Sequence, residues 1–169
     1  MTSQIRILAV DDYPDITDAL STLFRSKGAT CDTAGGLREA VRKFNSACDA
    51  GAKCYDAIIL DVDLRMVSGI GLLKLIRPLL PEVPAFILTG YDSPLVRLRA
   101  KQLKAEVDEK PLLDANAFVD KVVTAALAYQ ISKPPSDHAR LILPEVVEEI
   151  LRHSAPAIPA MPQPSDLFG

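Results

Sequence analysis

The chain lacks a long hydrophobic run and a block of basic residues. No apolar stretch approaches the roughly 20 residues of a membrane-spanning helix, so we expect no membrane association. Lysine and arginine total 19 against 22 aspartate and glutamate residues, which gives a formal net charge of −3. Direct nucleic-acid binding is therefore not expected, because it needs a basic face that displaces counterions from phosphates.

Cysteine is also scarce, and its spacing excludes a zinc site. The three cysteines are Cys31, Cys48 and Cys54, an odd number that cannot all pair within one chain. They match no zinc-ligand pattern, and we expect them to be reduced and without a redox role. The first residues, Met1–Gln4, carry no positively charged lead into a small-residue cleavage site. These features predict a soluble protein of the cytoplasm.

Hydrophobic residues make up 49% of the 169 residues, which is enough for a buried core. Three short apolar runs predict strands that are buried on both faces: Ile5–Val10, Tyr55–Leu60 and Ala85–Thr89. Two weaker candidates, Ala29–Thr33 and Ala105–Val107, are typical of short strands or sheet edges. The sequence therefore predicts five strands.

Amphipathic segments separate and follow these strands. Apolar residues recur at helical spacing in five segments: Pro14–Lys27, Leu37–Ala47, Ile70–Leu80, Leu95–Leu103 and Ala115–Ile131. Successive β-α units predict an α/β fold in three layers, with a doubly wound, five-stranded parallel sheet between helices. In such a fold the functional crevice lies at the carboxyl ends of the strands.

The composition changes after the last predicted helix. Proline becomes frequent, and we expect one domain over residues 1–132 and a Pro-rich tail over residues 133–169. A short amphipathic helix is predicted around residues 144–152. Its apolar residues are Val146, Val147, Ile150 and Leu151, and its acidic residues are Glu145, Glu148 and Glu149. We expect this helix to dock on an apolar surface of its own domain, a second copy or a partner.

Polar residues follow four of the predicted strands: Asp11-Asp12, Asp61 with Asp63, Thr89-Gly90, and Lys110-Pro111. Each alone reads as a turn or helix cap, but parallel strand ends meet at one edge, so these side chains should converge. Clustered carboxylates are costly without a cation, and oxygen ligands of this kind suit Mg²⁺. A lysine and a hydroxyl nearby suit a phosphoryl group, and an aspartate can be its nucleophilic acceptor.

This constellation resembles the receiver domain of two-component response regulators, from Ile5 to about Ile131. The matching motifs are Asp11-Asp12, Asp61, Gly69 eight residues later, Thr89-Gly90 and Lys110-Pro111. The resemblance implies a flavodoxin-like sheet with strand order 2-1-3-4-5. It also implies a bacterial phosphoacceptor switch that catalyses only its own phosphotransfer and dephosphorylation, rather than an enzyme with an external substrate.

The resemblance further implies a role for each site residue. Asp61 would accept a phosphoryl group from a sensor histidine kinase or a phosphotransfer protein in a phosphorelay. Asp12 would bind Mg²⁺ directly and Asp11 through water, with Asp61 and the main-chain carbonyl of Asp63 completing the protein ligands. Lys110 would pair with a phosphoryl oxygen.

The expected switch element is Thr89, whose hydroxyl would move toward the phosphate and reshape the surface of the fourth helix, fifth strand and fifth helix. Two residues depart from the family pattern. Val107 occupies the position where receivers usually carry an aromatic residue, and Arg65 a position where many carry proline. We expect Tyr91 to take over part of the signalling. Asp63 and Tyr91 should also influence the lifetime of the phosphoaspartate.

Fewer than 40 residues follow the domain, too few for a winged helix, so the expected output is protein contact. Self-association is expected through the fourth helix, fifth strand and fifth helix, or through the tail. The basic residues Arg97, Arg99, Lys101 and Lys104 of the fourth helix are expected to form a solvated face. The alternative is that they pair across a dimer with acidic Glu106, Asp108, Glu109 or Asp120.

Two alternatives remain open. Residues 58–63 resemble the nucleophile motif of haloacid dehalogenase-type phosphatases, which would make Asp63 a general acid. The second alternative is a degenerate receiver that acts only as a binding module.

Overall fold

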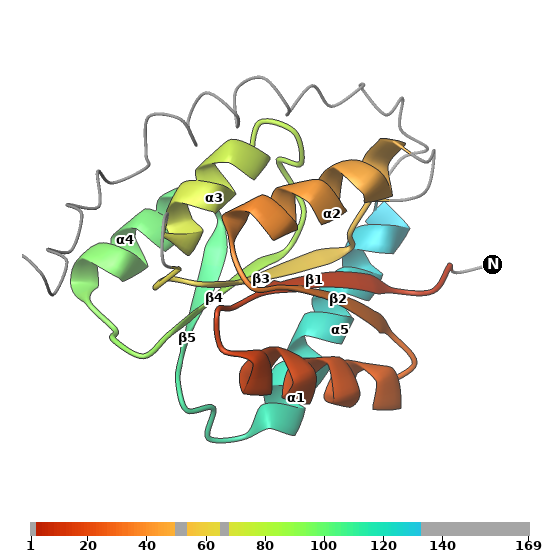
Figure 1. Cartoon of the computed structure of the whole chain (residues 1–169), viewed down its shortest axis with the longest axis horizontal. Helices are drawn as coiled ribbons and strands as arrows, with labels where there is room; N and C mark the ends of the chain where they lie inside the picture. The colour runs from red at the N-terminus through yellow and green to blue at the C-terminus, as the bar shows by residue number, and fades with distance from the viewer. Residues whose placement is uncertain (1–2, 50–53, 65–67, 133–169) are drawn as a thin grey trace, which may run out of the picture.

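The computed structural model describes residues 3–49, 54–64 and 68–132 (Figure 1). The strands are β1 (Arg6–Val10), β2 (Thr30–Ala34), β3 (Ala57–Asp61), β4 (Ala85–Thr89) and β5 (Ala105–Glu109). The helices are α1 (Pro14–Ser26), α2 (Leu37–Asp49), α3 (Gly69–Ile76), α4 (Pro94–Gln102) and α5 (Ala115–Ser132). The tail and its predicted helix around residues 144–152 lie outside the described residues.

All five strands are parallel, in the order β2-β1-β3-β4-β5, which confirms the predicted topology. Leu8 of β1 pairs with Ile58 of β3, and Ile58 pairs with Ala85 of β4. From β1 the chain first adds β2 on one side and then returns to add β3, β4 and β5 on the other side. The strand order therefore reverses between β1 and β3. In folds of this kind, ligands bind at the carboxyl ends of these two strands.

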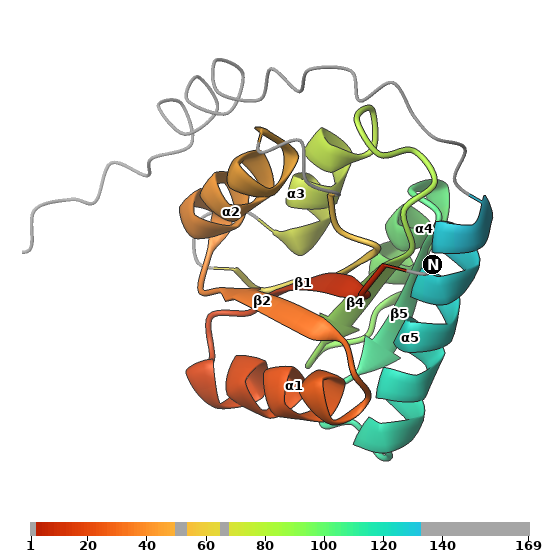
Figure 2. The ribbon, with the colours of Figure 1, turned by 90° about the vertical axis from the view of Figure 1, so that its right-hand side faces the viewer.

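The sheet lies between two helical layers (Figures 1 and 2). Leu8 and Leu60 point toward α2 and α3, whereas Ile7 and Ile59 point toward α1 and α5. These strand residues are buried on both faces because successive side chains alternate between the two cores. Their continuous apolar runs have this origin, as the sequence predicted.

Helix α3 ends at Ile76, four residues before the predicted end at Leu80. Pro78 lacks the N–H that would continue the helical ladder. The guanidinium of Arg77 instead donates hydrogen bonds to the carbonyls of Leu80 (3.1 Å) and Val83 (2.7 Å). These bonds close the turn that leads into β4.

The cysteines differ in state. Burial and the charge of Asp32 raise the pKa of the Cys31 thiol to about 12, which agrees with an unreactive residue. Cys54 is buried and disulfide-bonded, so the expectation of a reduced thiol is wrong at this position; its partner lies outside the described side chains. Among the described helices, none combines the length and the apolar character needed to cross a bilayer.

Candidate functional site

Three carboxylates gather at the carboxyl end of the central strands. Asp11 and Asp12 follow β1, and Asp61 is the last residue of β3, the strand beside it. Each contributes an oxygen that lies within 4.8 Å of the others. Asp11 and Asp61 are only 4% and 3% exposed, while Asp12 is partly exposed. The expected convergence of these three residues is therefore present in the structure.

Lys110 reaches this cluster from the far side of β4. It directly follows β5, and its backbone N–H donates to the carbonyl of Thr89 at 2.8 Å. Its Nζ lies 2.5 Å from Asp11 Oδ2 and 3.2 Å from Asp61 Oδ1. The lysine thus bridges the two buried carboxylates.

The charges of the cluster are unbalanced, with three carboxylates around one ammonium group. Burial raises the pKa of Asp61, and the negative charge of Asp11 adds to this effect, while Lys110 opposes it. Burial alone would lower the pKa of Lys110, but the hydrogen bond to Asp11 and the charges of both aspartates outweigh it, and the pKa is raised. A further cation would therefore stabilise the site.

The donor set fits Mg²⁺. The oxygens of Asp11, Asp12 and Asp61 lie within 4.8 Å of one another, which is near enough for all three to reach one ion, directly or through a bound water. These residues are all carboxylates, the ligand type that this ion takes from proteins, and the partly exposed Asp12 leaves room for bound waters.

Gly69, the first residue of α3, packs against the last residue of β3. A Cβ at this position would lie 2.1 Å from the backbone oxygen of Asp61. The backbone N–H of Gly69 also donates to the carbonyl of Val62 at 3.2 Å. Only a residue without a side chain permits this approach, so Gly69 serves a packing requirement of the site.

Asp63 takes a different position from the other aspartates. Its backbone N–H donates to Asp61 Oδ1 at 3.3 Å, but its side chain is exposed and does not belong to the carboxylate cluster. The main-chain carbonyl of Asp63 as a metal ligand stays a prediction.

The hydroxyl of Thr89 is engaged with its own loop. Thr89 is fully buried, and its Oγ1 donates to the carbonyl of Tyr91 at 2.8 Å and accepts from the N–H of Tyr91 at 3.0 Å. The Tyr91 side chain is 75% exposed. Thr89 is the last residue of β4, the strand next to β3, but its hydroxyl is bonded within the turn that precedes α4.

The structure also reveals a contact that the sequence analysis missed. The backbone N–H of Tyr13 donates to Asp11 Oδ1 at 2.9 Å, so the other oxygen of Asp11 is the one that meets Lys110. The available signal was an aspartate two residues before Tyr13, the N-cap residue of α1, a spacing at which a side chain often closes a turn with the backbone.

The charged residues proposed for a dimer contact are largely paired within the chain. Lys121 of α5 lies 3.1 Å from Glu106 and 2.7 Å from Asp108, and Lys27 lies 2.8 Å from Asp120. Apart from exposed Arg99, Lys101 and Glu109, this surface also carries apolar residues, since Leu95 and Leu98 of α4 are 54% and 55% exposed.

Residues 7–123 match the response regulator receiver domain family. Among curated proteins, the "Transcriptional regulatory protein CpxR homolog" of Haemophilus influenzae is 33% identical over 101 residues, which cover 60% of this chain and 41% of that protein. The chain spans less than half the length of the first curated relatives that it matches.

Solved structures share the fold. A CheY-like receiver domain protein from Methanospirillum hungatei has a TM-score of 0.68 at 21% identity and covers 78% of this chain and 100% of its own. The beryllofluoride-activated dimer of the NtrC4 receiver domain has a TM-score of 0.64 at 30% identity, with 73% and 98% covered.

The matched segment contains the acidic pair, the last residue of β3 and the lysine that bridges them. Because the family match covers more than half of the chain and agrees with the observed strand order, this chain belongs to the response regulator receiver domains, the signalling switches of two-component systems.

Proposed function

We propose that Asp61 accepts a phosphoryl group from a phosphohistidine and that the chain signals through the resulting change in its surface. The observation that carries this proposal is the position of Lys110 Nζ, 3.2 Å from Asp61 Oδ1 and 2.5 Å from Asp11 Oδ2, at the edge of a three-aspartate cluster. A metal site alone would not need the ammonium group, whereas a transferred phosphoryl group does.

In the proposed step, a carboxylate oxygen of Asp61 attacks the phosphorus atom of the phosphohistidine. A P–O bond forms and the P–N bond breaks, with its electron pair returning to the imidazole nitrogen, which takes up a proton. The donor is the histidine of a sensor kinase or of a phosphotransfer protein. Hydrolysis by water later restores the aspartate and releases inorganic phosphate.

Each neighbouring group has a function in this step. Lys110 pairs with a phosphoryl oxygen, while Asp11, itself oriented by the Tyr13 N–H, holds the ammonium group in place. Mg²⁺, when bound, neutralises negative charge on the phosphoryl oxygens. Asp11, Asp12 and Asp61 would hold the ion, Asp11 through water, together with the main-chain carbonyl of Asp63.

Thr89 connects the phosphoryl group to the surface. To bind a phosphoryl oxygen, its hydroxyl must leave the carbonyl and N–H of Tyr91, to which it is now bonded. The loop from Gly90 to Ser93 then loses its anchor. Because Ser93 caps α4 by accepting from the Val96 N–H at 3.2 Å, the movement reaches the start of that helix. The exposed Tyr91 moves with the loop. Because position 107 is a valine, this pathway does not include the aromatic side chain that receivers usually carry there.

The phosphatase alternative is less well supported. It assigns general-acid chemistry to Asp63, whose exposed side chain lies outside the carboxylate cluster. A degenerate receiver is also disfavoured, because Asp11, Asp12, Asp61 and Lys110 are all present and adjacent.

The proposed output is protein contact in the cytoplasm, without direct nucleic-acid binding. Self-association through α4, β5 and α5 is part of this proposal, and the dimer of the activated NtrC4 receiver domain supports it. The pairs within this chain suggest that the contact is made by the apolar side chains of α4 rather than by Glu106 and Asp108.

The test is incubation with Mg²⁺ and acetyl phosphate, followed by intact mass measurement. We expect one added phosphoryl group in the unmodified protein and in Asp18→Asn, a matched control on the exposed side of α1. Asp61→Asn should show none, and chelation of the metal should abolish labelling. Labelling of Asp61→Asn, or steady hydrolysis of many phosphoesters, would contradict the proposal.

The switch can be tested separately because the chain has no tryptophan. In Tyr91→Trp the single indole reports on the loop, and beryllofluoride with Mg²⁺ should change its emission. The change should be absent in Tyr91→Trp combined with Thr89→Val or with Asp61→Asn. An equal change in the Thr89→Val background would show that the hydroxyl does not move the loop.

A further inference from the structure

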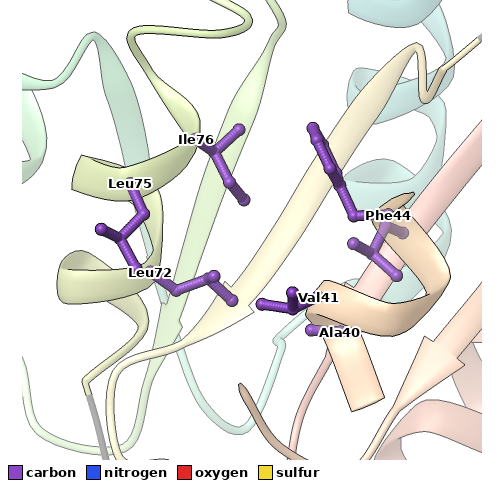
Figure 3. A pocket seen from close by; sticks show the side chains of 7 residues that line it. Ala40, Val41, Phe44, Leu72, Leu75 and Ile76 are labelled. Atoms are coloured by element: carbon purple, nitrogen blue, oxygen red, sulfur yellow. The ribbon is translucent and has the colours of Figure 1, made fainter. Parts of the chain in front are cut away.

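An apolar groove runs between α2 and α3, on the face of the sheet opposite α1 and α5. Figure 3 shows its walls, with Val41 and Phe44 on one side and Leu72 and Leu75 on the other. The empty space between these walls is about 240 Å³ and includes open solvent. Val41 and Leu75 are partly buried, whereas Phe44 and Leu72 are at most 2% exposed. Burial of apolar area gains about 25 cal/mol per Å², so a segment that docks here gains from covering Val41 and Leu75 and from burying its own apolar side chains.

We propose that residues 144–152 of this same chain dock in the α2–α3 groove as an amphipathic helix. The segment has an apolar pattern that matches the lining, since Val146, Val147, Ile150 and Leu151 recur at helical spacing. A helix of nine residues is about 13.5 Å long, comparable to the eight residues of α3, so the two can lie side by side.

Charge favours this occupant. The predicted helix carries Glu145, Glu148 and Glu149 on the side away from its apolar residues. The groove is bordered by two helices with exposed basic residues: Arg38 and Arg42 on α2, and Lys74 on α3. Within the described part of the chain, none of these three forms an ion pair, and α3 contains no acidic residue. The acidic outer side of the segment would therefore lie near exposed positive charges of both helices.

The connecting chain is long enough. Helix α5 ends at Ser132, and the 11 residues from 133 to 143 can span up to about 40 Å. The helices of a parallel sheet run opposite to the strands, so α2, α3 and α5 all end at the same edge of the sheet (Figure 2). The tail has to pass around this edge, and layers packed about 10 Å apart place the two faces about 20 Å from one another.

The exposed residues Leu95 and Leu98 are the competing surface. They project from the single helix α4 and offer one wall, whereas the α2–α3 groove offers two. That surface also belongs to the region that the proposed switch moves. Docking between α2 and α3 does not depend on phosphorylation of Asp61, so the two proposals can fail separately.

Hydrogen exchange of the full chain, followed by mass spectrometry, tests the inference. We expect residues 144–152 to be protected in the unmodified protein and to exchange at least about tenfold faster in Leu75→Glu, a factor equivalent to about 1.4 kcal/mol of docking free energy. Ile150→Glu with Leu151→Glu should raise exchange in the tail and in α2 and α3. Leu98→Glu is the matched control on α4 and should leave the tail protected.

A second variant covers the case in which Leu75→Glu does not fold. Arg38→Glu with Arg42→Glu changes only exposed side chains and should release the tail in part, with reversal when Glu148→Arg and Glu149→Arg are added. Fast exchange of residues 144–152 in the unmodified protein would overturn the inference. Release by Leu98→Glu instead of Leu75→Glu, or protection that falls on dilution, would also overturn it, pointing to α4 or to a second copy.

Discussion

Asp56 directly precedes β3 and Asp61 is its last residue, and the two side chains are 0% and 3% exposed. The Oδ2 atom of Asp56 accepts a hydrogen bond from the backbone N–H of Arg6 at 2.9 Å and another from Gln130 Nε2 at 2.8 Å. Asp61 instead faces Asp11 and Asp12 and shares a single lysine with Asp11. Two buried aspartates thus have different surroundings: Asp56, before the start of β3, accepts hydrogen bonds from neutral donors, whereas Asp61, at its end, faces other carboxylates.

This contrast separates a structural carboxylate from a reactive one. Asp56 ties β1 and the last turn of α5 to the start of β3 through two hydrogen bonds that its Oδ2 accepts. Asp61 is held where its charge is disfavoured, as its raised pKa indicates. Such strain is useful only where a ligand relieves it, and the carboxyl edge of a parallel sheet is the edge that ligands reach.

The largest expected effect is on the structural side. Asp56→Ala should lower the free energy of unfolding by about 3 kcal/mol, because it leaves two partly buried donors, on Arg6 and Gln130, without their acceptor. Urea denaturation measures the loss. At temperatures where the variant is folded, labelling by acetyl phosphate should be unchanged, since the site lies at the other end of β3.

Asp56→Asn is the matched control for this prediction. Its amide oxygen can still accept from both donors, so the loss should be clearly smaller than for Asp56→Ala. Equal losses in the two variants would mean that charge, rather than the acceptor, is what the amino end of β3 requires. A loss below about 1 kcal/mol for Asp56→Ala would contradict the structural role.

A smaller effect on stability is expected at the reactive end. In Gly69→Ala the new Cβ would meet the Asp61 backbone oxygen, a contact of 2.1 Å that the strand can relieve only by moving. Forced insertions of this kind cost about 1–3 kcal/mol. Because the displaced residue is the proposed phosphoacceptor, we also expect slower labelling by acetyl phosphate. Gly36→Ala is the control, since a Cβ there meets no atom within 4 Å.

The two ends of β3 also differ in how far their side-chain contacts could be predicted from the sequence. Asp11, Asp61 and Lys110 could be brought together in advance because a parallel sheet aligns the ends of its strands, whatever the details of packing. The role of Asp56 could not be predicted, because its partners come from β1 and α5 and no local pattern marks them. The Thr89 hydroxyl was also beyond prediction, since its bonds to Tyr91 depend on a side-chain rotamer.

The smallest expected effect has the opposite sign from that of Asp56→Ala. Asp61→Asn should raise the free energy of unfolding of the metal-free protein by about 1 kcal/mol, the scale of one under-compensated buried polar group. The raised pKa of Asp61 means that the fold disfavours the ionised form, so a neutral amide of the same shape relieves repulsion from Asp11. Urea denaturation at neutral pH with a chelator present measures the gain.

Added Mg²⁺ should then stabilise the unmodified protein more than the variant. Asp61 is one of the proposed ligands, and an ion that binds only the folded state shifts the equilibrium toward it. Destabilisation of the metal-free variant would place Asp61 with Asp56 among the structural carboxylates.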